Sequence, residues 1–266
     1  MRYSANKFIT YQICLLALVF GSVSVHANVV GKIGGDLSVN QGGVGCGLSL
    51  PMPSGVHSIN PGISLNYSAQ APNSIVGPGF ALKASMAITR CTPTIEKDGF
   101  ESAIQTDQLS RFCHDGQRLI SVSGPDGQNG TEYRSYDNNN VKYQSIGGSN
   151  YTPVKWIVYS PSGYELEFQR YGSSEDQYAT WLLITKTDHF GNTMEYDYID
   201  GGLPLLNSIS YSGYDISFDY QDKSAPHSFY QGGVLVDNNQ ILDTITVTAP
   251  NSDPLYFFDF TYEYFT

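Results

Sequence analysis

The feature that most constrains the fold is a strict alternation of apolar and polar residues in the C-terminal half of the chain. It occurs in three segments, each closely following a glycine: residues 164–169, 194–198 and 215–220. Counted from each of these glycines, the third and fifth following residues are always large and apolar. Because a period of two residues puts one set of side chains on each face of a strand, each segment is predicted to be a half-buried β-strand.

Each alternating segment is preceded by an apolar run that can form the first arm of a β-hairpin. The first arms are 154–159, 181–186 and 206–211, and the turns carry Gly163, Gly191 and Gly213. Glycine suits hairpin turns that need a positive φ, and the three glycines are spaced 28 and then 22 residues apart. The pattern is therefore an imperfect repeat of one supersecondary unit. A fourth hairpin is predicted from 241–248 and 255–265, around a turn at 250–254.

The N-terminal half also favours strands, separated by turns rich in proline and glycine. Its expected elements are a loose glycine-rich entry segment at 28–47, strands at 48–50 and 63–67, a turn-rich stretch at 71–80, one short helix at 100–113, and a polar loop or domain seam at 124–140. The sequence thus predicts an all-β fold. A Gly/Pro-rich β region at 28–150 would precede β-hairpin repeats at 151–266.

Charge and composition exclude several classes of protein. The 266 residues include 25 Asp and Glu but only 14 Lys and Arg, for a formal net charge of −11. Binding to nucleic acid or to an anionic membrane surface needs clustered Lys and Arg, so both are disfavoured. Aromatic residues make up 13% of the chain and charged residues only 15%, which argues against a long disordered protein.

The first 27 residues are typical of a secretory signal peptide. Arg2 and Lys7 precede an uncharged, mostly apolar run from Ile13 to Val25, and Ala27 closes a short Val-His-Ala cleavage site. We expect cleavage after Ala27, secretion to the periplasm or beyond, and no membrane insertion after cleavage. The alternative is a transmembrane anchor, for which the apolar run is short.

Three cysteines, Cys46, Cys91 and Cys113, lie after the predicted cleavage point. An exported chain enters an oxidising compartment, where disulfides persist. Cys91 and Cys113 are the favoured pair because they flank one intervening segment, and the closed loop would stabilise the fold by roughly 3 kcal/mol in the chain-entropy model. Cys46 would then be a small buried residue or a free thiol. The alternative is that all three are reduced.

Several short motifs resemble known sequences. The stretch 191–198 resembles a unit of the Rhs/YD-repeat family, with Gly191, Asn192, Tyr196 and Tyr198 as its motif residues. The order of motifs before it is similar to the opening of the SpvB-type domain. Those motifs are 50–55, 61–68, 76–80, 88–91 and 112–119, and the last of them contains Asp115, Gly116, Gln117 and Arg118.

The SpvB-type domain begins the virulence protein SpvB and the B subunit of insecticidal toxin complexes. The resemblance, which covers residues from about 42 to the C-terminus, implies a region that helps to build a hollow β-strand shell around a cytotoxic fragment. It implies a scaffold without catalytic residues or cofactors, whose partners are a further Rhs/YD-repeat chain or toxin-complex subunits. Family members are several times longer, so a truncated form is expected.

Motifs that would indicate catalysis are missing. The sequence has no Gly-x-Ser-x-Gly elbow, His-Glu-x-x-His, phosphate loop or Cys-x-x-Cys, and we predict no enzymatic activity, cofactor or metal. Glu165 and Glu167 form a Glu-x-Glu, as in ADP-ribosyltransferases, but a solvated strand face is favoured. His114 and Asp115 could form a functional pair, but a structural turn at this position is the favoured interpretation. Asp188, Asp197 and Asp200 could bind calcium, but the spacing of a calcium-binding loop is missing, so an acidic strand-and-turn surface is favoured.

The aromatic residues leave a second interpretation open. A stripe of tyrosines could stack against sugars, which would make the chain an exported carbohydrate- or surface-binding β domain. Period-two placement more often indicates core and cross-strand packing, so the scaffold is favoured.

The run 255–265 contains no proline, lysine or glycine that would blunt a sheet edge. Self-association through this strand is therefore expected, unless it is paired on both sides.

Overall fold

The computed structural model describes residues 25–28, 35–40, 43–104, 106–137, 140–148, 151–172, 180–231 and 234–263. The described chain forms twenty strands, one short α-helix and one 3₁₀ turn, as the alternating sequence predicted. Fourteen of the strands form one large antiparallel sheet, four form a smaller sheet, and two form a separate short hairpin. The all-β fold class is therefore confirmed.

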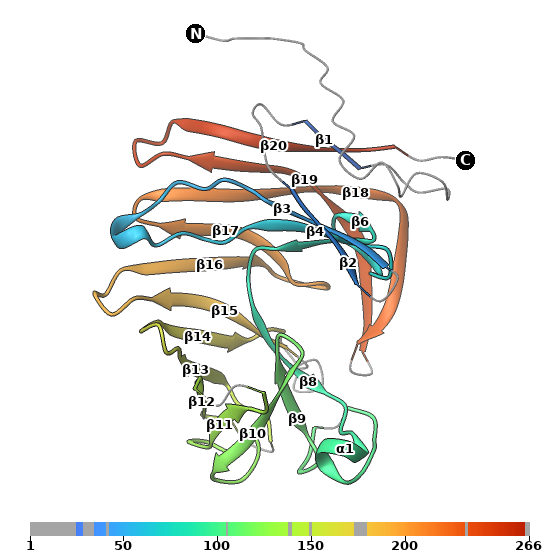
Figure 1. The fold of residues 1–266 in the computed structure, drawn as a ribbon, viewed down its shortest axis with the longest axis vertical. Helices are drawn as coiled ribbons and strands as arrows, with labels where there is room; N and C mark the ends of the chain where they lie inside the picture. The colour runs from blue at the N-terminus through green and yellow to red at the C-terminus, as the bar shows by residue number, and fades with distance from the viewer. Residues whose placement is uncertain are drawn as a thin grey trace.

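Eight consecutive strands of the large sheet close into a ring, which occupies the lower part of Figure 1. They are β8 (Ala87–Cys91), β9 (Arg111–His114), β10 (Gln117–Ser123), β11 (Glu132–Ser135), β12 (Lys142–Ile146), β13 (Lys155–Tyr159), β14 (Glu165–Arg170) and β15 (Thr180–Thr187). Each strand pairs with the next, and β8 returns to pair with the start of β15, where Ile88 lies opposite Trp181. This closure leaves no free edge at the β8 end of the sheet.

The second half of β15 begins an open sheet above the ring (Figure 1). It continues through β16 (Thr193–Ile199), β17 (Leu205–Tyr211), β18 (Tyr214–Gln231), β19 (Val234–Thr248) and β20 (Pro254–Tyr262) to β1 (Val25–Asn28). All four predicted hairpins are present: β13–β14, β15–β16, β17–β18 and β19–β20. Their turns lie at the glycines and at the 250–254 segment that the sequence indicated.

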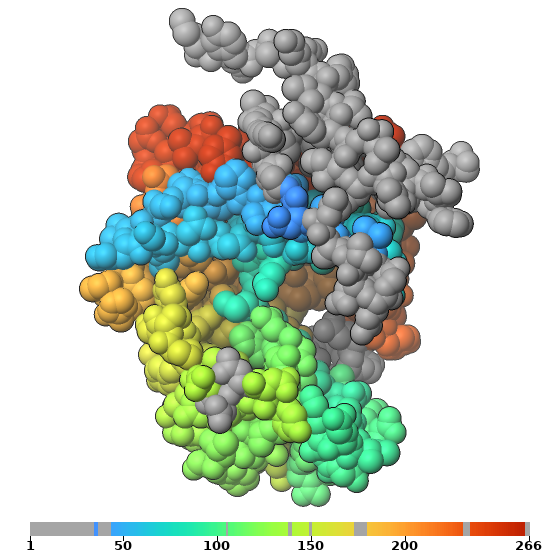
Figure 2. Space-filling view, viewed as in Figure 1, coloured from blue at the N-terminus to red at the C-terminus, as the bar shows by residue number. Residues whose placement is uncertain are grey.

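A small sheet lies across one face of the open sheet (Figures 1 and 2). Its strands are β2 (Gly35–Asn40), β3 (Gly43–Ser49), β4 (Ser64–Ser68) and β7 (Phe80–Lys83), accompanied by the hairpin β5 (Asn73–Ser74)–β6 (Gly77–Pro78) and the 3₁₀ turn η1 (Val56–Ser58). Hydrogen bonds join the two layers: the Tyr211 hydroxyl donates to the Pro53 carbonyl at 2.8 Å, and the Leu242 amide donates to the Ile75 carbonyl at 2.7 Å.

The core of the ring is aromatic. Phe112, Trp156 and Trp181 are almost completely buried and meet edge to face, with centroid separations of 5.0 Å for Phe112–Trp156 and 6.0 Å for Trp156–Trp181. Such contacts stabilise aromatic pairs beyond their buried area. The Arg90 guanidinium lies 5.3 Å from the Phe112 ring centroid and donates to Thr152, and burial lowers the pKa of Arg90 to about 10.

Burial follows the predicted alternation. Leu166 and Phe168 are buried, while Glu165 and Gln169 on the opposite face of β14 are exposed. The same holds in β18, where the buried residues are Ile216 and Phe218 and the exposed ones are Asp215 and Asp219. The apolar face packs into the core and the polar face meets solvent.

The short helix lies elsewhere than predicted. The only α-helix among the described residues is α1 (Ile95–Asp98), and part of the predicted 100–113 helix is instead strand β9. Thr94 caps α1 by accepting from the Lys97 amide, and Gly99, at φ 76°, ends it after one turn. The apolar spacing that suggested a helix therefore belongs to a loop followed by a strand.

Two predicted irregular segments contain strands. The entry segment 28–47 was expected to be loose, but β2 and most of β3 lie in it and pair with each other. The 124–140 segment contains β11, which pairs with β10 and β12. The predicted boundary at 150/151 falls between β12 and β13, which pair over five residues; the division into domains stays a prediction.

The predicted signal peptide lies mostly outside the described residues, which begin at Val25. Strand β1 contains Val25–Ala27, the residues expected to precede cleavage, and pairs with β20 from Asp259 to Tyr262. The last strand is thus paired with β19 on one side and over four residues with β1 on the other. None of the described residues form a helix long and apolar enough to cross a membrane.

Candidate functional site

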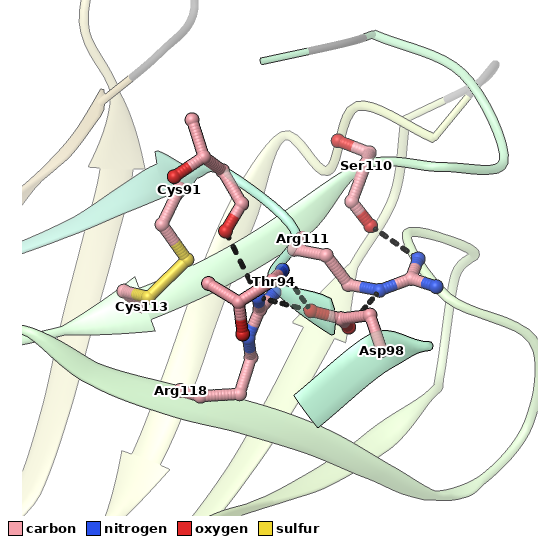
Figure 3. Close-up of a disulfide and its surroundings, with 8 residues drawn as sticks. Cys91, Thr94, Asp98, Ser110, Arg111, Cys113 and Arg118 are labelled. Carbon is pink, nitrogen blue, oxygen red and sulfur yellow. Dashed lines mark hydrogen bonds and ion pairs between the residues drawn. A yellow bond between two sulfur atoms is a disulfide. The ribbon is translucent and has the colours of Figure 1, made fainter. Parts of the chain in front are cut away.

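The SpvB-like motif lies beside a disulfide. Cys91 of β8 and Cys113 of β9 are joined by an S–S bond, with their Cα atoms 5.9 Å apart, and the pair ties together two neighbouring strands of the ring (Figure 3). Cys46 lies half-buried in β3. Cys91 belongs to the 88–91 motif and Cys113 to the 112–119 motif, so the disulfide joins two of the SpvB-like motifs within the ring.

Arg118 of the motif is held in a buried ion-pair cluster. Its Nη2 donates to Asp98 Oδ2 at 2.7 Å and to the Thr92 carbonyl at 3.1 Å, while Arg111 Nε donates to Asp98 Oδ1 at 2.8 Å (Figure 3). The Arg118 and Asp98 side chains are only 3% and 4% exposed. The Asp98 carboxylate, at the end of α1, therefore joins the helix to β9 and β10.

The electrostatics of Asp98 fit this role. Burial alone would raise its pKa, but the hydrogen bond from the Thr94 amide and the charges of Arg111 and Arg118 outweigh burial, and the pKa of Asp98 lies below its usual value. Burial also lowers the pKa of Arg118, against the attraction of Asp98. The cluster is therefore ionised, and Asp126, 3.6 Å from Arg111 Nη1, adds a second carboxylate to it.

Asp115 and Gly116 form the two-residue turn of the β9–β10 hairpin. Both have positive φ, 49° and 75°, the conformation that a tight hairpin turn of this type requires and that Asp-Gly favours. Gln117 follows on the exposed side of β10. The motif Asp-Gly-Gln-Arg therefore forms a hairpin turn that is followed by a buried arginine.

The His114 side chain contacts aromatic residues of the core rather than forming a hydrogen bond with Asp115. Its Nδ1 lies 3.0 Å from the Tyr143 hydroxyl, and its ring meets those of Tyr143 and Phe168 edge to face. Burial lowers the pKa of His114, so the neutral imidazole is favoured in the folded protein. The histidine is part of the packing of the ring.

The YD-like residues lie in β16 and the turn before it. Asn192 Nδ2 donates to Asp188 Oδ2 at 2.7 Å across the turn that contains Gly191. The Tyr196 hydroxyl donates to the Met194 sulfur, and the Tyr198 hydroxyl donates to the Leu183 carbonyl at 3.1 Å. Both tyrosines therefore point into the core and lock β16 to its neighbours, which is a structural role.

Three further tyrosines of the open sheet behave in the same way. Tyr220 donates to the Leu206 carbonyl at 2.8 Å, Tyr256 to Pro51 at 2.8 Å and Tyr262 to Leu242 at 2.6 Å. Burial raises the pKa of Tyr198 to about 12 and raises that of Tyr220 as well. These rings are used in packing between the strands and are not free to stack against a sugar, whereas Tyr230, near the end of β18, is 74% exposed.

The acidic candidates lie apart. Glu167 pairs with Lys155 at 3.0 Å, and Asp188 accepts from the Phe190 and Asn192 amides of its own turn. Asp197 accepts from Asn207 at 2.6 Å. Across the parts of the chain that the structure describes, no three His, Cys, Asp or Glu residues come together as a metal site.

Sequence reasoning missed two groups that hold the fold together. Asp98 was not singled out, although Thr94, Asp98 and Gly99 form a recognisable helix start and stop. Lys223 was also missed: its buried ammonium donates to the Ser74 carbonyl and to Asn238 Oδ1, joining the β5–β6 hairpin to β18 and β19. Nothing local in the sequence marks that contact.

No protein-family model and no curated protein sequence matches the chain. Solved structures do match. The TcdB2-TccC3 crystal structure aligns with 81% of this chain at 20% identity and a TM-score of 0.63. The Photorhabdus luminescens Tc holotoxin pore aligns with 94% of this chain at 19% identity and a TM-score of 0.64. The chain spans 14% of each of those chains.

The N-terminal domain of the effector protein SpvB from Salmonella typhimurium strain LT2 is also similar. It aligns with 82% of this chain at 15% identity and a TM-score of 0.62, and 98% of that domain is covered. The match therefore includes nearly the whole of a separately solved domain. The fold of this chain is that of an SpvB- and toxin-complex-type, Rhs-related domain.

Proposed function

We propose that the chain is an exported, non-catalytic scaffold segment of a toxin-complex-like or Rhs-like virulence protein. The observation that carries this proposal is the fold likeness to toxin-complex and SpvB components over most of the chain. The contacts of the motif residues support the proposal, because the side chains of Arg118, Tyr196 and Tyr198 all make contacts that stabilise the sheet. Export rests on the signal-like first 27 residues.

The sheet itself suggests how such a segment would join its partners. One end of the large sheet is closed into the ring, and at the other end β1 pairs only with Asp259–Tyr262 of β20. Among the described residues, the first half of β20 therefore offers an edge to which a further strand can be added. Leu255 and Phe257 lie two residues apart on one face of this part of β20 and are 48% and 58% exposed, so they form an apolar surface beside the edge that a partner can cover. A further Rhs/YD-repeat chain or a toxin-complex subunit would supply the next strand.

A complementation experiment tests the proposal. A TcdB2-TccC3 chain lacking the segment that aligns with this protein is co-expressed with the full 266-residue chain, and the two are tested for co-elution on size exclusion. Co-elution in a fixed ratio is expected. A Phe257→Lys variant, which puts a charge beside the proposed joint, should weaken it, while Tyr136→Ala, at an exposed site in the ring region, should not. Separate elution of two folded chains would refute the proposal.

A further inference from the structure

A hollow of about 310 Å³ opens on the polar side of the sheet between two hairpin turns. It is lined by residues of β13, β14 and β15 and of the turns beside them, among them Tyr159, Tyr164, Glu165, Thr187, Asp188 and His189. This volume lies at the lower end of the range for small-molecule sites. The scaffold role uses none of these residues, and they lie far from the β20 end in strand order.

The strand register lines up three different chemical groups along the floor of the hollow. Tyr159 lies directly opposite Glu165, and Glu165 lies directly opposite Thr187 on the next strand. Neighbouring strands are about 4.8 Å apart, so an aromatic ring, a carboxylate and a hydroxyl form a row roughly 10 Å long. Thr187 Oγ1 is fixed by Thr193 Oγ1 at 3.2 Å, which keeps the far end of the row in place.

The Tyr159 ring and the Glu165 carboxylate both reach solvent. Tyr159 is 40% exposed, whereas Tyr196 and Tyr211 of the open sheet are buried, and the Lys142 ammonium lies 5.8 Å from the Tyr159 ring centroid, where a ligand can replace it. The Glu165 side chain is exposed and makes no hydrogen bond or ion pair within the described residues. By contrast, both carboxylate oxygens of Asp188 are engaged in its own turn, so Asp188 contributes negative charge and shape rather than a free acceptor.

This row suits a hydroxylated ring. An aromatic face packs against apolar C–H groups, and an ionised carboxylate accepts hydrogen bonds but cannot donate them. The ligand must therefore present hydroxyl donors to Glu165 beside an apolar surface for Tyr159. Glu165 and Asp188 together repel an anionic ligand, and the Lys142 ammonium beside Tyr159 is already paired with Glu132 at 2.6 Å. We propose that the hollow is a binding site for a neutral saccharide, with Tyr159 as the stacking platform and Glu165 as the principal acceptor.

The experiment uses the full chain on an array of neutral glycans (glucan, mannan and N-acetylhexosamine oligomers) beside sialylated and uronic-acid glycans, followed by calorimetry on the strongest neutral ligand. We expect binding to neutral glycans only. Tyr159→Ala and Glu165→Gln should each weaken the affinity about tenfold or more, while Tyr136→Ala, exposed but outside the hollow, should leave it unchanged. Circular dichroism confirms that each variant is folded.

Three results would overturn the proposal: no neutral glycan bound, only acidic glycans bound, or binding that survives both Tyr159→Ala and Glu165→Gln. The outcome is independent of the scaffold role, because the hollow and the β20 joint are tested by different variants. A chain that complements the toxin shell but binds no neutral glycan refutes only the saccharide site. The reverse result refutes only the scaffold.

Discussion

Replacing Asp98 with asparagine should destabilise the protein strongly, although Asp98 lies in no catalytic motif. The substitution keeps the shape of the side chain but removes the negative charge that pairs with Arg118 and Arg111, of which Arg111 alone keeps a second ion pair, with Asp126 at 3.6 Å. Among the described residues, Asp98 is the only carboxylate within ion-pair distance of the Arg118 guanidinium, which is 3% exposed. Breaking a buried pair by removing one partner typically costs about 3–5 kcal/mol because the other charge is left uncompensated.

The assay is urea unfolding of wild type and Asp98→Asn, followed by circular dichroism, with the free energy of unfolding compared at equal slope. Glu132→Gln is the matched control, because it breaks the Lys142–Glu132 pair, whose side chains are about one-third exposed. That control should lose less than about 1 kcal/mol. A loss for Asp98→Asn no larger than the control's would refute the buried-cluster argument.

The same cluster predicts an acid-sensitive fold. Because the pKa of Asp98 is lowered in the folded state, its contribution is fully present above the unfolded value, about 3.9, and is lost as the pH falls through the lower folded value. Wild type should therefore lose stability more steeply than Asp98→Asn below about pH 4, and parallel curves would contradict this. Replacing Cys91 and Cys113 together by alanine should cost roughly 3 kcal/mol in urea unfolding; no loss would show that the bond does not constrain the chain.

Tyr143 and Tyr198 should stay protonated at high pH until the protein unfolds, because burial raises the pKa of each to about 12. Their contribution to stability is fully present below the pKa of an unfolded tyrosine, about 10, and is lost as the pH rises through about 12. If all the tyrosines ionise near pH 10, as measured by tyrosinate absorbance, while the near-ultraviolet dichroism of the folded protein is unchanged, this prediction is wrong. Phe257→Lys should reduce self-association of the purified chain measured by light scattering, and an unchanged mass distribution would contradict the edge argument.

The hairpins of the C-terminal half could be predicted from the sequence because their cause is local. Alternation fixes which face of a strand is buried, and a turn glycine fixes where the chain reverses. In β14, Leu166 and Phe168 are buried and Glu165 is exposed, as their order along the chain requires. Pairing of adjacent hairpin arms then follows without knowledge of the rest of the molecule.

The ring closure and the buried cluster could not be predicted in the same way. Trp181 lies opposite Ile88, and no local pattern couples residues so far apart in the chain. Arg118 similarly reaches Asp98, which comes twenty residues earlier and lies on a different element. The helix prediction at 100–113 failed for a related reason, since Phe112 is buried against Tyr133, Trp156 and Trp181 of other strands of the ring rather than by a helical neighbour.

The central claim is that this chain is a scaffold segment whose sheet continues into a partner through β20. Hydrogen–deuterium exchange on the full chain, alone and mixed with the TcdB2-TccC3 chain that lacks the aligned segment, tests this directly. We predict that the amides of 255–258, the part of β20 not paired with β1, exchange in the free chain and become protected in the mixture, while those of the ring strands do not change. Binding that protects other surfaces and leaves β20 unchanged, or no binding at all, would contradict it.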